Sequence, residues 1–184
     1  MRTILPALVA VCALSACTTS TTSDPTPSST SMVAPAVAGD QGLPFDAMPD
    51  IPTGRNELVP CPYLDSQWVA DTNGQRVLGS GIDERFDHPA CVFWSYAEEE
   101  QLTVMVRTMA SESDAEQVVN WAAPIDTTEP ADLPAGWMGG RLGSPGRSLY
   151  AVYKDNKAVV VFTNQDQSLK AQLVAEETIK NLGL

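Results

Sequence analysis

Residues 149–163 read LYAVYKDNKAVVVFT, and they give the clearest structural signal in the chain. Two apolar runs, 149–153 and 158–163, have the length of strands and flank the polar segment Lys-Asp-Asn-Lys at 154–157. A short polar loop between two such runs predicts a β-hairpin. Because a hairpin pairs its two strands antiparallel, the stretch indicates a fold built on an antiparallel sheet.

The segments on both sides of this hairpin predict one more strand and the longest helix. Residues 137–142 predict a strand, which a Gly-Ser-Pro-Gly turn at 143–146 separates from the hairpin. Residues 168–182 predict a helix that ends at Gly183. The residues expected on its core face are Leu169, Leu173, Val174 and Leu182.

Upstream of residue 137 the pattern predicts two more helices. One is short, spans 65–72 and ends at Asn73-Gly74. The other begins with a Ser-x-x-Glu capping box at 113–116 and runs to about Ala122. The acidic, proline-containing residues 125–135 that follow are expected to form a loop.

Three strands are expected between these two helices. They lie within 75–86, at 91–97 and at 102–107, and the last two show the alternation typical of strands. The order along the chain is therefore helix, three strands, helix, three strands, helix. Because short loops join neighbouring strands, we predict an α+β domain, a twisted antiparallel sheet with helices packed against one or both faces.

The chain begins with the features of a bacterial export signal. A positively charged start and an apolar run from Ile4 to Ala13 precede Leu14-Ser15-Ala16-Cys17. The apolar run is too short to span a membrane, which takes about 20 apolar residues. The tetrapeptide resembles the lipobox of bacterial lipoproteins, which implies cleavage after residue 16 and lipid attachment at Cys17. The alternative is an ordinary cleaved signal followed by a chance cysteine.

Composition divides the rest of the chain into two regions. Residues 17–58 contain Cys17 and a Thr-, Ser-, Pro- and Ala-rich stretch, which we interpret as a disordered tether because it offers little apolar surface to bury. Residues 59–184 are long enough for a single globular domain. Two or three acyl chains such as palmitate would anchor the protein durably, since each buried CH₂ contributes about 0.8 kcal/mol. We expect a domain that is lipid-anchored on the extracytoplasmic face of the membrane.

The chain is acidic, with 11 Lys and Arg against 23 Asp and Glu and a net charge of −12. A surface of this sign repels nucleic-acid phosphates and anionic lipid headgroups. Nucleic acid is therefore excluded as a partner, and the domain is expected to stand off the membrane that its lipid anchors it to.

Four cysteines occur in the precursor, and two remain once the signal and the lipid attachment site are set aside. These are Cys61 and Cys91, and in an exported protein such a pair predicts one disulfide bond. Two separate buried thiols are the alternative. A metal site fits less well, because the chain has a single histidine and the two cysteines are far apart in sequence.

Several local motifs resemble a family of small exported lipoproteins of actinobacteria, including mycobacteria and corynebacteria, whose function is unknown. The resemblance covers about residues 58–184 and is carried by four segments: Cys61-Pro62-Tyr63-Leu64, 73–77 (NGQRV), Cys91-Val92-Phe93-Trp94 and 150–153 (YAVY). It implies the same fold, disulfide and location, and it assigns no catalytic residue. Distant members are thought to bind envelope lipids, which favours a carrier as the alternative function.

The sequence contains no pattern that indicates catalysis or a cofactor. His88 is the only histidine, it lies in a turn-like Asp-His-Pro segment, and no Gly-x-Ser-x-Gly motif is present. The carboxylate groups at 83–84, 98–100 and 126–132 have the spacing of solvated turns rather than of an acid–base pair. We therefore expect neither an enzyme nor a bound cofactor or metal.

Three residues are the candidates for contact with a ligand or partner. Trp137 lies among glycines and is the best candidate for an exposed or pocket-lining aromatic side chain. Arg141 and Arg147 flank the 143–146 turn and could together hold an anionic headgroup or a partner's carboxylate. Solubility and local ion pairing are the alternative roles for the two arginines.

These observations predict an uncharacterised envelope lipoprotein that acts as a non-enzymatic binding or accessory module for a protein partner. A flexible tether suits this role because it keeps the domain concentrated near membrane partners. The alternative is a carrier with a pocket for a lipid or small apolar ligand between sheet and helices. A hydrolase is the third and weakest hypothesis.

Overall fold

The computed structural model describes residues 42–184, and the predicted signal peptide, Cys17 and most of the predicted tether lie outside the described residues. Over 42–184 the chain forms three α-helices, two short 3-10 helices and seven strands. The helical elements are η1 (Gly54–Asn56), α1 (Ser66–Asn73), α2 (Glu112–Ala122), η2 (Pro134–Gly136) and α3 (Ser168–Leu182). The strands are β1 (Gly79–Asp83), β2 (His88–Trp94), β3 (Glu100–Thr108), β4 (Glu129–Leu133), β5 (Trp137–Ser144), β6 (Arg147–Lys154) and β7 (Lys157–Thr163).

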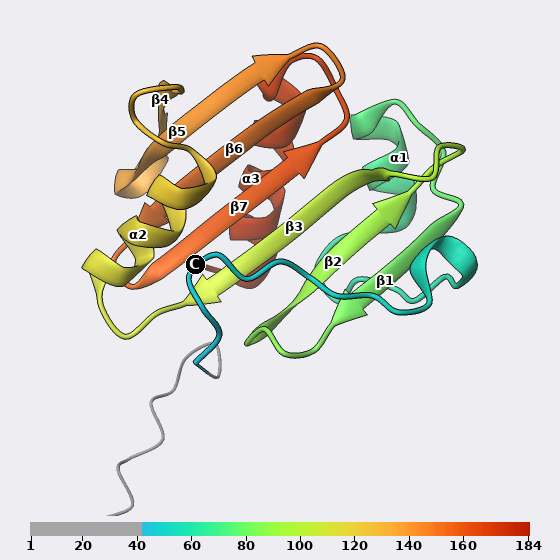
Figure 1. Cartoon of the computed structure of the whole chain (residues 1–184), viewed down its shortest axis with the longest axis horizontal. Coiled ribbons are helices and arrows are strands. Elements are labelled where there is room, and N and C mark those ends of the chain that lie inside the picture. The colour runs from blue at the N-terminus through green and yellow to red at the C-terminus, as the bar shows by residue number, and fades with distance from the viewer. Residues whose placement is uncertain (1–41) are drawn as a thin grey trace, which may run out of the picture. The chain divides into compact units, whose positions relative to one another are not determined.

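The seven strands form one open antiparallel sheet in the order β1-β2-β3-β7-β6-β5-β4 (Figure 1). The predicted α+β class, the antiparallel sheet and the hairpin at 149–163 are confirmed, with β6 and β7 at the middle of the sheet. The second half of the chain has four strands rather than three. The extra strand is β4, which forms within the segment expected to be a loop and pairs with β5 at the edge of the sheet.

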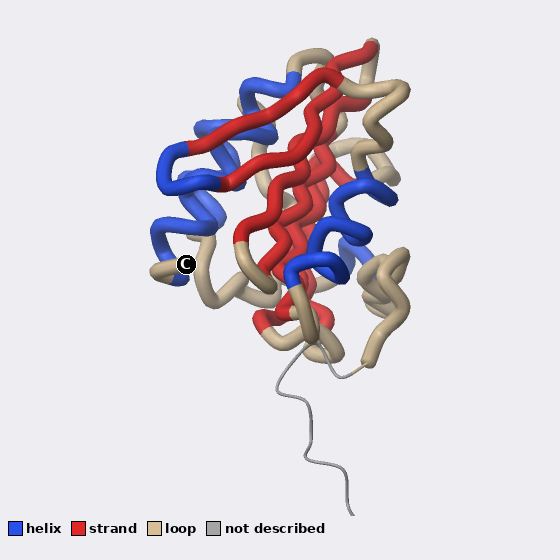
Figure 2. Tube along the Cα trace, turned by 90° about the vertical axis from the view of Figure 1, so that its left-hand side faces the viewer, coloured by secondary structure: helices blue, strands red, loops and turns tan. Residues whose placement is uncertain are grey.

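Helices cover both faces of the sheet, as the edge-on view shows (Figure 2). On one face, α1 and α3 pack on Val159 and Val161 of β7, and on the other face α2 packs on Ala158 and Val160 of the same strand. Successive strand residues point to opposite faces, so the run Ala-Val-Val-Val supplies both layers of the core. A strand buried on both sides reads as a continuous apolar run.

The buried face of α3 differs from the predicted one. Ala171, Val174, Ala175 and Thr178 are buried, at the i, i+3, i+4, i+7 spacing of a single helix face. Leu169 and Leu173 are 56% and 41% exposed, so their assignment to the core was wrong. Small side chains on the inner face let the helix lie close to the sheet, and the leucines extend outward.

Local capping signals explain where the helices begin and end. Asp65 caps α1 by accepting a hydrogen bond from the Trp68 backbone N–H at 2.8 Å, and Gly74 ends the helix in the left-handed conformation with φ 72°. The Ser111 hydroxyl caps α2 by accepting from the Asp114 N–H at 3.2 Å. The predicted capping box at 113–116 was therefore placed two residues too late.

Residues 42–58, which we call the N-terminal strap, lie against the sheet although the sequence analysis assigned them to the tether. Leu43 and Ala47 pack on the core that α2 also covers. In Figure 1 the strap and α2 lie on the same side of the sheet, with the strap over β1–β3 and α2 over β5–β7. The strap thus covers part of the face that no helix reaches.

The buried side chain of Arg107 holds the beginning of the strap. Its guanidinium donates to the carbonyl oxygens of Leu43, Pro44 and Phe45 at 3.1, 2.9 and 3.2 Å. The same group lies 5.5 Å from the ring centroid of Phe86, within the range of a cation–π contact. Arg107 is 1% exposed, so its charge is stabilised by protein groups, these oxygens and the ring among them, rather than by water.

The end of the strap pairs with the outer edge of β1. The Ser80 N–H donates to the Glu57 carbonyl at 2.9 Å, and the Val59 N–H donates to the Ser80 carbonyl at 2.8 Å. These bonds occupy part of an edge that would otherwise offer free backbone groups to another chain.

Candidate functional site

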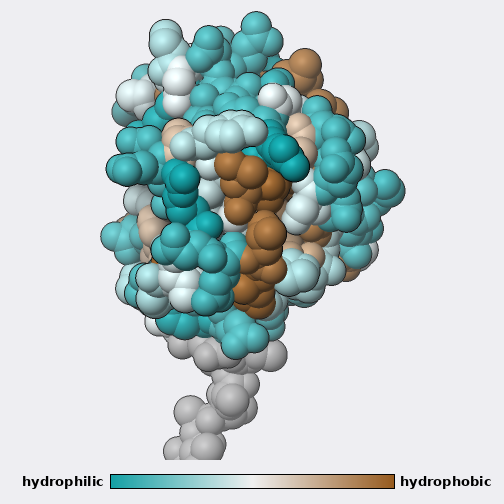
Figure 3. Space-filling view, turned by 90° about the vertical axis from the view of Figure 1, so that its right-hand side faces the viewer, coloured by the Kyte–Doolittle hydropathy of each residue, from teal (hydrophilic) through white to brown (hydrophobic). Residues whose placement is uncertain are grey.

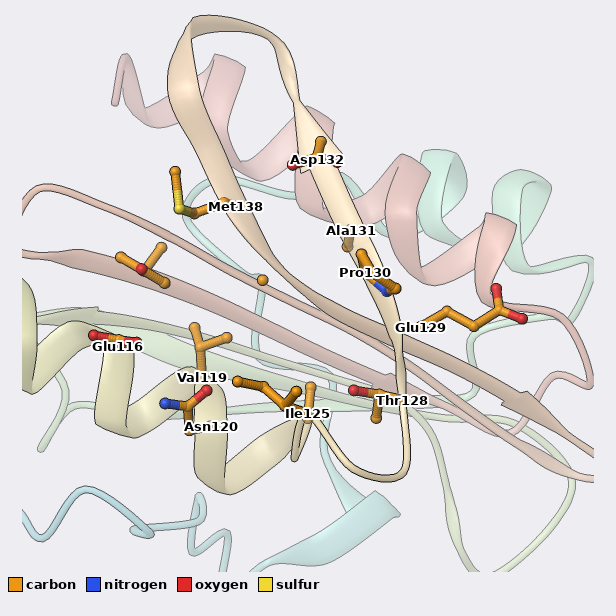
Figure 4. A pocket seen from close by; sticks show the side chains of 13 residues that line it. Glu116, Val119, Asn120, Ile125, Thr128, Glu129, Pro130, Ala131, Asp132 and Met138 are labelled. Carbon is orange, nitrogen blue, oxygen red and sulfur yellow. The ribbon is translucent and has the colours of Figure 1, made fainter.

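A pocket of about 350 Å³ opens between α2 and the β4–β5 hairpin (Figure 4). Its apolar lining comes from both walls and from the connection between them: Val119, Ala123, Ile125, Pro130, Ala131, Met138, Gly139 and Tyr153. Polar side chains complete it: Glu116, Asn120, Thr128, Glu129 and Asp132. This volume lies at the lower end of the range for ligand sites, which is about 300–1,000 Å³.

Two glycines of β5 lie where α2 approaches the hairpin closely. A β-carbon on Gly139 would overlap the carbonyl oxygen of Ala151 on β6 and lie 2.9 Å from Cγ1 of Val119. One on Gly140 would lie 2.7 Å from the Thr128 hydroxyl and 2.8 Å from Cβ of Ala123. These distances are too short for ordinary contacts, so glycine is needed at both positions, by the neighbouring strand and Thr128 as well as by α2. The floor of the pocket is therefore formed by helix side chains against nearly bare strand backbone.

The mouth of the pocket is open and keeps apolar side chains in contact with water. Ile125, in the connection from α2 to β4, is 78% exposed, and Met138 of β5 is 47% exposed. Figure 4 shows Val119 and Ile125 on the α2 side facing the hairpin that carries Met138 and Asp132. Apolar side chains in such a position are the kind of surface that a partner's side chain would cover.

The charged groups that line the pocket are all acidic: Glu116 from α2, and Glu129 and Asp132 from β4. Glu129 is paired with Arg141 of β5 at 3.3 Å, as expected for two residues that face each other across the β4–β5 ladder. The Tyr153 hydroxyl has a raised pKa because of burial and, secondarily, because of the negative charge of Glu116 and Glu112. The tyrosine is therefore neutral at physiological pH.

Trp137 does not line this pocket. It is 3% exposed and belongs to the core cluster that contains Ala131, Tyr150 and the buried residues of α3. Its expected exposure, inferred from the neighbouring glycines, was wrong. The glycines at 139 and 140 make room for α2 rather than leaving the tryptophan uncovered.

The two arginines that flank the 143–146 turn do not form a shared anion site. In the β5–β6 hairpin Arg141 faces Tyr150 and Arg147 faces Ser144, so the two positions are three residues apart along the ladder. An odd separation puts their side chains on opposite faces of the sheet. Arg141 is engaged with Glu129, and the exposed Arg147 extends toward solvent.

Cys61 and Cys91 form the predicted disulfide, which joins the segment before α1 to β2. Disulfides persist in oxidising compartments, so this bond indicates an extracytoplasmic protein. Cys17, the predicted lipid attachment site, lies outside the described residues. Within 42–184 no helix is long and apolar enough to cross a membrane.

Other parts of the described chain offer weaker candidates. No three His, Cys, Asp or Glu side chains within 42–184 gather as metal ligands would. Asp83, expected in a solvated turn, is 5% exposed and binds Arg85 at 2.6 Å and the Asp50 N–H at 2.9 Å, so its role is structural. The β1 side of the molecule carries a narrow strip of apolar surface between hydrophilic flanks (Figure 3).

Sequence reasoning missed the pocket because its walls come from segments that only the fold brings together. The segment 125–135 was read as a solvated loop, although it forms one wall and an edge strand. One sequence feature could have indicated the pocket. Ile125 and Met138 are apolar residues on either side of an acidic stretch, and Met138 is followed by the glycine pair at 139–140.

Comparison with known proteins identifies one family. A domain of unknown function (DUF2020) matches residues 43–184, which includes all but the first residue of the strap, the sheet, all three described helices and the pocket. The match begins at Leu43, whose carbonyl oxygen accepts a hydrogen bond from Arg107. A search of curated proteins finds no match to this chain.

Proposed function

We propose, for a chain that belongs to the DUF2020 family, that it is a lipid-anchored binding module of the cell envelope, without catalytic activity of its own. The pocket between α2 and the β4–β5 hairpin is its contact site for a protein partner. The observation that carries this proposal is an open pocket with an apolar floor, two exposed apolar side chains at its mouth, and walls formed by α2 and by the β4–β5 hairpin.

The shape of the pocket favours a protein partner over a carried ligand. A carrier encloses most of its ligand's surface, commonly 70–90%. Here one side is open to water, and Ile125 and Met138 are partly exposed at the mouth. A site of this kind suits one apolar side chain projecting from a partner's surface, which is how the central anchors of protein interfaces are bound.

The anchor at Cys17 is part of the proposal. Its support is the lipobox-like Leu-Ser-Ala-Cys sequence after an apolar run, the resemblance to exported actinobacterial lipoproteins, and the disulfide that indicates an oxidising compartment. Metabolic labelling with radioactive palmitate should mark the wild-type protein and leave the Cys17→Ser variant unlabelled. Equal labelling of both, or of neither, contradicts the anchor.

The contact site is tested by site-specific photo-crosslinking in the native envelope. A photoreactive amino acid is placed at Met138, and a matched control is placed at Tyr96, which is 72% exposed in the β2–β3 connection. We expect a discrete protein adduct from position 138 and none from position 96. A second probe at Ile125 should give the same adduct, and Met138→Asp should abolish it by placing a charge at the apolar mouth.

The same experiment separates the alternatives. An adduct of equal yield from positions 138 and 96 means that the pocket is not the contact site. A lipid adduct at position 138, with lipid co-purifying in native mass spectrometry, means that the chain is a carrier instead.

A further inference from the structure

We infer that the segment that enters the α2–hairpin pocket is basic: an apolar side chain flanked by lysine or arginine on the partner protein. This inference rests on the proposed function, because it specifies the chemistry of the occupant of the same site. The evidence for a basic occupant is the charge of the side chains around the pocket. The evidence for the site itself is a different observation, the apolar floor.

All the charged side chains that line the pocket are carboxylates, and none is a lysine or an arginine. Glu116 stands on the α2 wall, and Asp132 and Glu129 stand on the hairpin wall. Glu129 is already paired with Arg141 at 3.3 Å. Among the described residues no lysine or arginine lies within ion-pair distance of Glu116 or Asp132. Two negative charges at the pocket are therefore left for a ligand to neutralise.

Glu116 and Asp132 lie on opposite walls of the pocket, which suits an apolar side chain that has a basic residue on each side of it. An apolar side chain that reaches Val119 on the floor has Glu116 on the helix wall and Asp132 on the hairpin wall (Figure 4). Basic residues before and after that anchor would each meet a carboxylate. An acidic segment would meet like charge at both walls, which electrostatic complementarity selects against.

The charge of the whole molecule acts in the same direction. The net charge of −12 attracts a basic segment over distances of about a Debye length, roughly 8 Å at physiological ionic strength, and so raises its association rate. An anionic lipid headgroup would be repelled by both the pocket and the molecule. A cationic segment of a protein is therefore the occupant that the charges favour.

The inference is tested with three probes that share a six-carbon chain and differ in charge: hexylammonium, 1-hexanol and hexanoate. Each is titrated into the isotope-labelled chain from Thr18 onward, which keeps every described residue, and the NMR signals of Val119, Ala131 and Met138 are followed. We expect hexylammonium to bind about 2- to 10-fold more tightly than hexanol at low salt, because each exposed ion pair contributes a small factor. Hexanoate should bind most weakly, and 1 M salt should bring the three affinities together.

Two variants assign the preference to the named carboxylates. Glu116→Gln with Asp132→Asn should remove the advantage of hexylammonium over hexanol, measured as the ratio of the two affinities in the same variant. Glu98→Gln, at an exposed turn far along the sheet from β4, is the matched control and should leave the advantage intact. Equal binding of the three probes to the wild-type chain overturns the charge inference but leaves the pocket as a site. Absence of shifts at all three residues with every probe overturns the site itself.

The sequence of the crosslinked partner peptide tests the inference directly. Mass spectrometry of the adduct formed at position 138 should identify a peptide with lysine or arginine within two or three residues of an apolar residue. An acidic or uncharged contact peptide refutes the inference while the proposed function stands. An adduct with a small cationic amphiphile would keep the charge preference and refute the protein segment as the occupant.

Discussion

Ile51 of the strap occupies the space that a side chain at Gly81 of β1 would need, since a β-carbon built on Gly81 would overlap Cγ2 of Ile51. Gly79, two residues earlier on the same strand, is in a similar position, but there the β-carbon would overlap the backbone of Arg55. The Gly-Ser-Gly sequence of β1 is therefore what allows the strap to lie flat along the edge of the sheet. One glycine faces a side chain, and the other faces backbone.

This difference leads to a prediction about substitutions at the two glycines. Gly81→Ala should lower the free energy of unfolding by about 1–3 kcal/mol, the usual cost of overpacking. Ile51→Ala should relieve most of that cost, so the double variant should be more stable than the sum of the two single effects predicts. Urea denaturation of the four proteins measures the coupling, which should reach about 1 kcal/mol. Gly79→Ala is the control, because shortening Ile51 cannot relieve a backbone clash. Additive effects of Gly81→Ala and Ile51→Ala would disprove the packing argument.

Arg107 is expected to be the residue that keeps the strap in place. Arg107→Met removes the donor to three carbonyl oxygens of the strap, and a buried acceptor left without a partner costs about 1–3 kcal/mol. We expect a total loss of roughly 2–5 kcal/mol of stability and faster protease cleavage within residues 42–58. Arg147→Met, at an exposed position, should change stability by less than about 0.5 kcal/mol. A variant at Arg107 whose strap resists protease as well as the wild type does would contradict this role.

The disulfide should contribute a substantial part of the stability. It closes a loop with a sequence separation of 30, for which loop-closure entropy predicts about 3–4 kcal/mol. Replacing both Cys61 and Cys91 with serine should lower the midpoint of thermal unfolding strongly. Reducing agent should bring the wild type to the same midpoint and leave the variant unaffected. A wild-type midpoint that does not move on complete reduction would show that the bond contributes little.

Local patterns in the sequence were sufficient to predict most of the fold. The hairpin of β6 and β7, the helix before β1 and the pairing of Cys61 with Cys91 follow from neighbouring residues or from simple counting. The edge strand β4 was missed because Pro130 and its acidic neighbours are typical of loops. At a sheet edge, however, a proline needs no partner for its missing N–H, so such a strand is tolerated.

Contacts between distant segments account for the rest of the differences. The core face of α3 was misassigned because the larger leucines outweighed the small residues Ala171 and Ala175, whose value lies in how closely they let the helix approach β6 and β7. The strap was read as tether because nothing in its own composition reveals Arg107, more than 50 residues away. The pocket depends on the same kind of information, since α2 and the hairpin meet only in the folded chain.

Asp83 should make the stability of the domain depend on pH in the acid range. Burial alone would raise the pKa of this carboxyl, but hydrogen bonds from the Arg85 side chain and from the N–H groups of Asp50 and Arg85 outweigh it, so the pKa is lowered. A lowered pKa in the folded state means that the contribution is complete above the unfolded value of about 3.9 and is lost as the pH falls through the folded value. The difference in unfolding free energy between wild type and Asp83→Asn should therefore be largest at pH 6–7 and shrink below about pH 4. A difference that stays constant from pH 7 to pH 2.5 would mean that the charge of Asp83 does not hold Asp50 and the strap.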